Sequence, residues 1–125
     1  MKTLNDNLDL LNIDKVLIEN QISPIANKMK CIQGMISQYF IMNNINDIQF
    51  VSSINKLKDY VQKKTNYSER KKLSIQITED ILKKYNLDNW ILYYNNKNIN
   101  KNKKDDLADS FLQGLWYFNS NKLII

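Results

Sequence analysis

Residues that make tight turns are scarce in this chain, which has two glycines and one proline among its 125 residues. β-sandwiches and barrels built of short strands need such residues about every eight to twelve positions. The sequence therefore disfavours those all-β folds and favours mostly helical or α/β folds. With 43% apolar residues, the chain is typical of a small soluble globular protein, and we expect one domain over residues 1–125.

The first half of the chain has the pattern of a βαβ unit. Residues 15–19 (KVLIE) and 48–51 (IQFV) are short aliphatic runs, typical of buried parallel strands. Between them, from Ile25 to about Met42, apolar residues recur every three or four positions and predict a long helix with one apolar stripe. Two strands joined through one helix should be parallel and adjacent. We therefore expect an α/β fold whose sheet begins here, preceded by a short amphipathic helix over residues 3–12.

The second half predicts two further helices. The first begins near Ser68 and is expected to be amphipathic and cationic. Its apolar face is predicted to hold Leu73, Ile77, Ile81 and Tyr85. The second begins near Lys104, after a polar run over residues 95–104 that we interpret as an exposed loop. Its predicted buried face consists of Leu107, Ala108, Phe111, Leu112, Leu115 and Phe118, with Gly114 allowing close packing. Residues 87–94 are ambiguous between strand and helix.

Charge is unevenly distributed along the chain. Residues 1–55 hold four Lys against five acids, residues 56–104 hold thirteen Lys or Arg against five acids, and residues 105–125 hold one Lys against three Asp. A basic segment of this size favours a polyanionic partner, most often nucleic acid. The alternative is a solvated surface in a chain whose composition is rich in Lys, Asn and Ile.

Several kinds of chemistry are excluded by residue type. There is no histidine, and Cys31 is the one cysteine, which excludes disulfide frameworks, Cys/His zinc sites, Ser-His-Asp triads and Cys-His nucleophiles. The chain has no run of about eighteen apolar residues and no signal-peptide pattern, so we expect an intracellular protein with no membrane partner. Carboxylates, amines and hydroxyls are what remains for chemistry.

Carboxylates stand out at two places. Glu19 follows three aliphatic residues at the end of a predicted strand, where reactive groups of open α/β sheets collect. Asp105, Asp106 and Asp109 lie at the predicted start of the last helix, where either Asp106 and Asp109 or Asp105 and Asp109 share a face. Such oxygen ligands suit Mg²⁺ or Mn²⁺. These carboxylates also have structural explanations. The Asp residues could offset the dipole of the last helix, and Glu19 could pair with a nearby Lys.

Four segments resemble a known family. They are IENQ at 18–21, NKM at 27–29, FVSSINKLK at 50–58 and KKDDLADSFLQGLWY at 103–117. Together and in this order they resemble the RuvC-like Holliday junction resolvases of the poxviral and fungal mitochondrial type. The resemblance implies an RNase H-like fold, a homodimer, and Mg²⁺-dependent nicking of four-way DNA junctions. By motif position it implies that Glu19, Asp106 and Asp109 are catalytic metal ligands, with Asp105 an adjacent candidate.

The sequence also departs from this family. Such enzymes carry a first acid in an Asp-x-Gly-like segment of an opening strand, and this chain has none. We therefore expect an RNase H-like domain that lacks its N-terminal strands, so that the resemblance alone does not establish activity for this chain.

Three functions stay open. The first is a structure-selective endonuclease of DNA recombination, replication or repair, in which Lys103 and Lys104 hold the scissile strand and Arg70, Lys71 and Lys72 hold a junction arm. The second is an inactive fragment that binds nucleic acid or a partner protein. The third is a helical interaction module that uses the apolar stripe of residues 25–42. For the DNA-binding functions, Trp90, Tyr93 and Tyr94 are candidates for stacking on bases. For the location in the cell, the resemblance implies the host-cell site of viral DNA replication if the protein is viral. It implies the mitochondrion or the nucleus if the protein is cellular.

Overall fold

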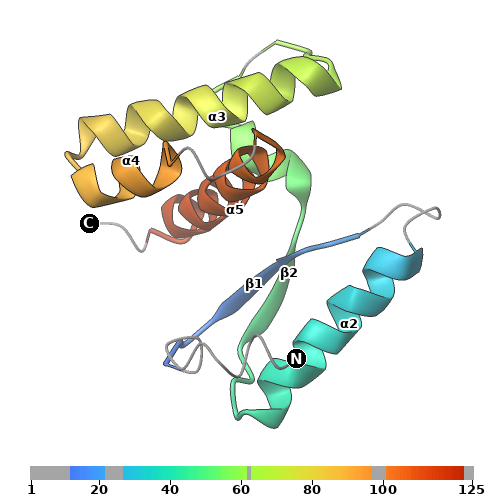
Figure 1. Cartoon of the computed structure of the whole chain (residues 1–125). Helices are drawn as coiled ribbons and strands as arrows, with labels where there is room; N and C mark the ends of the chain where they lie inside the picture. Colours follow the sequence, from blue (N-terminus) through green and yellow to red (C-terminus); the bar gives the residue numbers. More distant parts are fainter. Residues whose placement is uncertain (1–11, 22–26, 62, 97–100, 123–125) are drawn as a thin grey trace. The chain divides into compact units, whose positions relative to one another are not determined.

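The computed structural model shows a mixed α/β protein (Figure 1). The structure describes residues 12–21, 27–61, 63–96 and 101–122. Its elements are β1 (Val16–Glu19), α2 (Asn27–Met42), β2 (Ile48–Val51), the 3-10 helix η2 (Ser53–Leu57), α3 (Tyr67–Lys84), α4 (Asp88–Tyr94) and α5 (Lys101–Ser120). The helix predicted over residues 3–12 lies outside the described residues. The chain forms two compact units, Met1–Ser53 and Ile54–Ile125, and each is described by itself.

The first unit confirms the predicted βαβ pattern. β1 and β2 pair in parallel, with a register from Val16 opposite Ile48 to Glu19 opposite Val51. Hydrogen bonds extend the pairing at both ends, from Val16 N to the Asp47 carbonyl (2.9 Å) and from Asn20 N to the Val51 carbonyl (2.8 Å). Aliphatic and β-branched residues form both strands because their side chains pack well on a pleated surface.

Helix α2 lies along this sheet in the first unit (Figure 1), but its apolar stripe is only partly buried. Tyr39 and Phe40, near its end, join a core with Val16 and Ile45. Met29, Ile32 and Met35, nearer its start, are 49%, 38% and 58% exposed, so this part of the predicted apolar stripe is not covered. A helix of 16 residues is about 24 Å long, whereas strands of four residues span about 13 Å and cannot cover all of it.

In the second unit, helix α3 begins one residue before the predicted start. Asn66 caps it: its Oδ1 accepts from Glu69 N (2.9 Å), and Glu69 Oε2 accepts from Asn66 N (3.0 Å). This reciprocal capping box satisfies two backbone donors that the first helical turn cannot pair internally.

The packed face of α3 is rotated from the predicted one. Ser74, Thr78 and Leu82 are buried, whereas Tyr85 is 63% exposed. The other predicted face residues, Leu73, Ile77 and Ile81, are only partly buried. The reason is that α5 packs along the row of small polar side chains, which hydropathy does not mark as core.

Helices α4 and α5 complete the core of the second unit. Leu82, Tyr94 and Ala108 form its buried cluster. The segment over residues 87–94, which the sequence leaves ambiguous, is helical from Asp88 to Tyr94. Three expectations for the last helix are wrong. The helix begins at Lys101, within the predicted loop. Phe118, expected to be buried, is 47% exposed. A Cβ added at Gly114 would meet nothing within 4 Å, so this glycine does not serve close packing. No helix among the described residues has the length and apolar character of a membrane span.

Candidate functional site

Three carboxylates on α5 lie in its second and third turns. Because the helix begins at Lys101, none is in the first turn, so compensation of the helix dipole does not account for them. Asp105 is buried (6% exposed), Asp106 is exposed, and the Asp109 side chain is 28% exposed. The structure therefore turns Asp105 and Asp109, one helical turn apart, toward the packed side. Of the two pairings that the spacing left open, the structure thus favours Asp105 with Asp109, and Asp106 lies on the exposed side.

Each inward carboxylate contacts one lysine from another element. Lys71 Nζ of α3 lies 3.1 Å from Asp105 Oδ2, and Lys56 Nζ of η2 lies 2.9 Å from Asp109 Oδ2. The hydrogen bond to Asp105, followed by one to Tyr67, raises the pKa of Lys71 above its usual range. Sequence reasoning missed Lys56, although it belongs to the segment FVSSINKLK that carries the family resemblance.

The second carboxylate oxygen of Asp105, Oδ1, is buried and makes no hydrogen bond among the described residues. A buried carboxylate oxygen is costly to leave unpaired, so its position calls for a cation or a donor. Mg²⁺ keeps several waters and binds through one or two carboxylates, so Asp105 and Asp109 fit a hard divalent cation. Within residues 12–21, 27–61, 63–96 and 101–122, no three Asp, Glu or Cys side chains gather into a complete metal site.

Glu19 ends β1 in the first unit, where a polar network fixes the chain beyond it. Gln33 of α2 accepts from Gln21 N with its Oε1 (2.9 Å), and its Nε2 donates to Asn20 Oδ1 (3.5 Å). Gln21 Nε2 in turn donates to the Glu19 carbonyl (3.3 Å). Glu19 is partly buried, and its association with the acids of α5, which belong to the other unit, stays a prediction.

Comparison with known proteins decides the family. Residues 1–121 match the family model described as "Poxvirus A22 protein". The chain belongs to the Poxvirus A22 protein family. The resemblance to poxviral Holliday junction resolvases is therefore confirmed. The chain is also 31% identical to "Uncharacterized protein L451" of Acanthamoeba polyphaga mimivirus, over 91% of this chain and 31% of that relative. It thus spans about a third of that relative's length, and no solved structure matches it.

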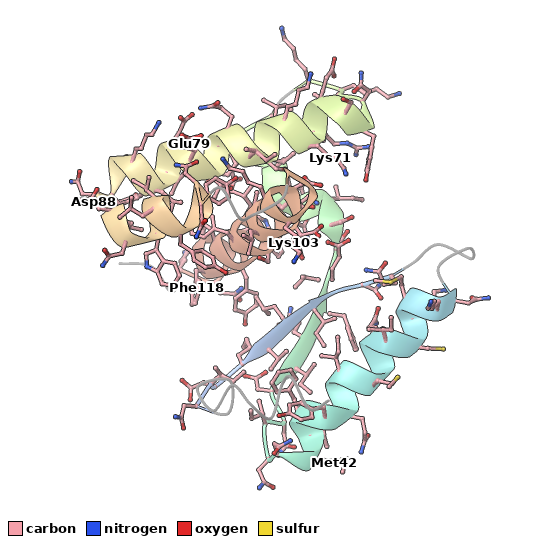
Figure 2. The ribbon with its side chains drawn as sticks, viewed as in Figure 1. Met42, Lys71, Glu79, Asp88, Lys103 and Phe118 are labelled. Carbon is pink, nitrogen blue, oxygen red and sulfur yellow. The ribbon has the colours of Figure 1, made fainter. Side chains whose placement is uncertain are left out.

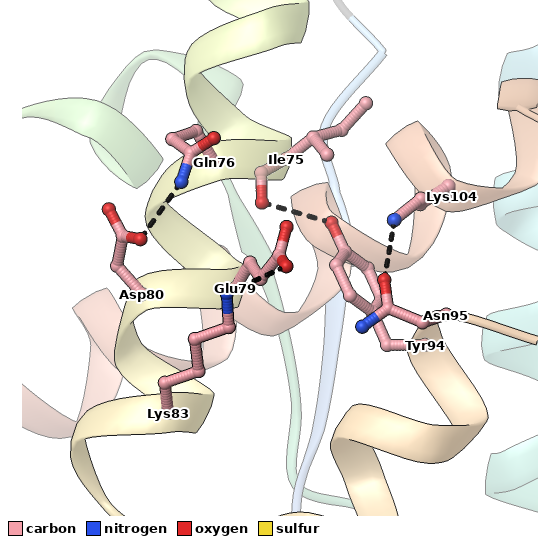
Figure 3. Close-up of polar contacts among 8 residues, drawn as sticks. All are labelled: Ile75, Gln76, Glu79, Asp80, Lys83, Tyr94, Asn95 and Lys104. Carbon is pink, nitrogen blue, oxygen red and sulfur yellow. Dashed lines mark hydrogen bonds and ion pairs between the residues drawn. The ribbon is translucent and has the colours of Figure 1, made fainter.

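The cations predicted to hold DNA differ in their surroundings in this A22 family member. Arg70, Lys72 and Lys103 are exposed, and Figure 2 labels Lys103 on α5. Lys71 is bound to Asp105, and Lys104 Nζ donates to Asn95 Oδ1 (2.8 Å; Figure 3). The exposed three are thus available to phosphates directly, whereas the other two would first exchange an internal contact. Their role in DNA binding stays a prediction.

Proposed function

We propose that this A22 family chain is the junction-resolving nuclease part of an RNase H-like protein and acts on four-way DNA junctions. Family membership over residues 1–121 supports the class of substrate. The observation that carries the chemistry is the buried Asp105, whose Oδ1 has no partner among the described residues, one turn before Asp109. An unpaired buried carboxylate oxygen beside a second carboxylate is the arrangement that a hard cation would complete.

The proposed site uses the following residues. Asp105 and Asp109 hold Mg²⁺ or Mn²⁺, with Asp106 and Glu19 as the further ligands that motif position implies. A cation held by these residues would activate a water and would stabilise the leaving oxygen of the phosphodiester. Lys56 and Lys71 neutralise the two carboxylates in the structure. Both lysines are then positioned to contact the phosphate that approaches the site.

The basic surface of the second unit supplies the affinity for DNA. Arg70, Lys72 and Lys103 contact phosphates without reading bases, as expected for a protein that recognises the shape of a junction. Their contribution predicts an affinity that falls steeply as salt rises. We further propose that the chain acts as a homodimer inside the infected host cell, because each junction needs two symmetric cuts.

The test is cleavage of a labelled four-way junction and of a linear duplex with the same arm sequences, in Mg²⁺, in Mn²⁺ and in EDTA. We expect symmetric nicks in the junction only, and only with a divalent ion. Asp109→Asn should lower the rate by orders of magnitude, because ligands of one metal site act as a unit. Asp88→Asn, which changes an exposed acid of α4, is the matched control and should cut normally.

Two outcomes would contradict the nuclease proposal. Equal binding of junction and duplex at low salt would remove the junction as substrate. Selective junction binding without nicks in either metal would support a DNA-binding protein that is not an enzyme.

The role of Asp105 needs a variant that separates chemistry from stability. Asp105→Asn alone leaves the Lys71 ammonium without its carboxylate, so Asp105→Asn combined with Lys71→Met removes both charges together. If Asp105 serves only as a structural partner of Lys71, the double variant should fold and nick at the rate of Lys71→Met alone. If Asp105 holds the metal, the double variant should fold and bind junctions but fail to nick them.

A further inference from the structure

The second unit contains a pocket that the proposed nuclease site does not use. It has a volume of about 430 Å³ and lies among α3, α4 and α5. Its walls are mostly aliphatic and aromatic, and include Leu82, Leu87, Trp90, Tyr93, Leu107 and Phe111. Pockets of roughly 300–1,000 Å³ with apolar walls and few polar groups are typical sites for small molecules.

One polar group in this wall has no partner. Thr78 lines the pocket and is 2% exposed, and its Oγ1 makes no hydrogen bond among the described residues. The second hydroxyl in the wall, that of Ser110, donates to the Leu107 carbonyl (3.0 Å). A buried hydroxyl without a partner is rare in folded proteins and points to a ligand that completes it. The ligand should therefore combine a flat apolar body with a polar edge.

Two large aromatic rings of the pocket wall are also exposed to solvent. Trp90 and Tyr93 line the pocket, yet they are 62% and 55% exposed, and their centroids lie 6.5 Å apart in an edge-to-face arrangement. Burial of such rings is normally favourable, so their exposure beside an apolar cavity leaves a stacking surface unused. Exposed Trp and Tyr rings are the side chains on which unpaired bases stack.

One lysine lies over a ring of the pocket wall. Lys104 Nζ lies 4.6 Å from the centroid of Tyr94, a pocket residue, and donates to Asn95 (Figure 3). An ammonium group beside an aromatic pocket favours a ligand that carries a phosphate next to its ring.

We propose that this pocket binds an unstacked nucleobase of an unpaired nucleotide. Trp90 and Tyr93 stack on the base, Thr78 Oγ1 hydrogen-bonds its polar edge, and Lys104 attracts the adjoining phosphate. The inference rests on the proposed function for one point, that the partner is nucleic acid. It adds a site for single-stranded nucleotides that is separate from the metal-binding acids of α5.

The test compares two probes in EDTA, where no cleavage occurs. One is oligo-dT, and the other is an abasic oligomer of the same length, which has the same phosphates and no bases. The full chain carries Trp116→Phe, so that Trp90 is its one tryptophan. We expect oligo-dT to quench Trp90 fluorescence and to bind more tightly than the abasic oligomer, because stacking on one base is worth roughly a 5- to 150-fold change in affinity.

Three variants assign the effect to the pocket and are measured by fluorescence anisotropy of labelled probes. Trp90→Leu and Thr78→Val should each weaken oligo-dT binding, by about fivefold or more for Trp90→Leu, and leave abasic binding unchanged. Leu92→Ala, at a position that is 73% exposed on the same helix, should change neither affinity. Thermal melting checks that each variant folds, and Thr78→Val should melt no lower than the parent because it removes an unpaired hydroxyl.

Two results would overturn the inference. The first is equal affinity of the parent for the two oligomers, and the second is that Trp90→Leu and Thr78→Val bind oligo-dT as tightly as the parent does. A pocket that instead binds an apolar peptide side chain would give those same results. Junction nicking, measured separately, tells the two proposals apart. If the protein nicks junctions but binds oligo-dT and the abasic oligomer equally well, only the pocket proposal fails. If it prefers oligo-dT but does not nick junctions, the pocket proposal stands and the nuclease proposal fails.

Discussion

Replacement of Ser74 by alanine should make the protein more stable. Ser74 lies in the middle of α3 with 1% of its surface exposed, and its Oγ has no hydrogen-bond partner among the described residues. It belongs to the row of α3 that packs against α5, whose Ala108 and Leu112 are 0% and 1% exposed. The hydroxyl has therefore lost its hydrogen bonds to water without gaining any from the protein.

The magnitude follows from two contributions. An unsatisfied buried hydroxyl costs about 1–3 kcal/mol, and its removal by Ser→Ala deletes one oxygen atom and leaves a space smaller than a water molecule. Alanine also has a higher helix propensity than serine, by about 0.5 kcal/mol. The free energy of unfolding should rise by about 1.5–3.5 kcal/mol for Ser74→Ala, which corresponds to a melting temperature higher by roughly 4 °C or more.

Urea unfolding followed by tryptophan fluorescence measures this change where it occurs, because Trp90 and Trp116 both belong to the second unit. Ser68→Ala is the matched control, since Ser68 is an exposed residue of the same helix and reports the difference in helix propensity alone. A Ser74→Ala variant that is less stable than the parent, or that gains no more than Ser68→Ala, would refute the reasoning and show that the hydroxyl is hydrogen-bonded.

Three further substitutions test the fold in the same assay. Asn66→Ala should cost about 1 kcal/mol by loss of the α3 cap, whereas Asn66→Asp should cost little, and equal stability of all three proteins would contradict the capping box. Gly114→Ala should raise stability by about 0.5–1 kcal/mol, because its Cβ meets nothing within 4 Å; a loss would mean a contact that the structure does not show.

Burial, followed by the charge of Glu79, raises the pKa of Tyr94 to about 12 in the folded protein, compared with about 10 when unfolded. The folded state then holds a proton that the unfolded state has lost, so stability should fall as pH rises from about 10 to about 12. Tyr94→Phe should lack this slope and be less stable at neutral pH, through loss of the hydrogen bond to the Ile75 carbonyl (3.2 Å; Figure 3); identical pH profiles would disprove the assignment.

The elements of the first unit could be predicted because their signals are local. β-branched runs define β1 and β2, and the spacing of apolar residues defines α2 between them, with bounds that agree within two residues. The exposure of Met29 and Met35 could not be predicted in the same way. A helical stripe shows which side of a helix is apolar, but the length of the sheet beneath it decides how much of that side is covered.

The second unit shows a different limit. The face of α3 was placed on its large aliphatic residues, yet the helix packs on Ser74 and Thr78. Small side chains let two helices approach closely whether or not they are apolar, so shape outweighs hydropathy at this contact. Thr78 also lines the pocket, which no periodicity in the sequence marks, because its walls come from three helices brought together by the fold.

The candidate acids show what a motif can and cannot specify. The segment DDLAD at 105–109 supplies Asp109 with a partner either three or four positions earlier, and spacing alone leaves both open. The packing of α5 distinguishes them, because Asp105, Ala108, Asp109 and Leu112 follow the spacing of one helical face, and this is the face that packs. Asp106 lies outside it and is exposed.

The carboxylates of Asp105 and Asp106 therefore differ in the free-energy cost of their burial. Burial of Asp105 costs free energy that Lys71 offsets through one oxygen and leaves uncompensated at the other, whereas the exposed Asp106 has no such cost. Motif position implies Asp106 as the ligand, and burial implies Asp105. The Asp105→Asn/Lys71→Met double variant and Asp106→Asn, compared in the junction assay with Lys71→Met and the parent respectively, decide between them. Loss of nicking only on substitution of Asp105 would mean that the metal binds on the packed face of α5, and loss only in Asp106→Asn that it binds on the exposed one.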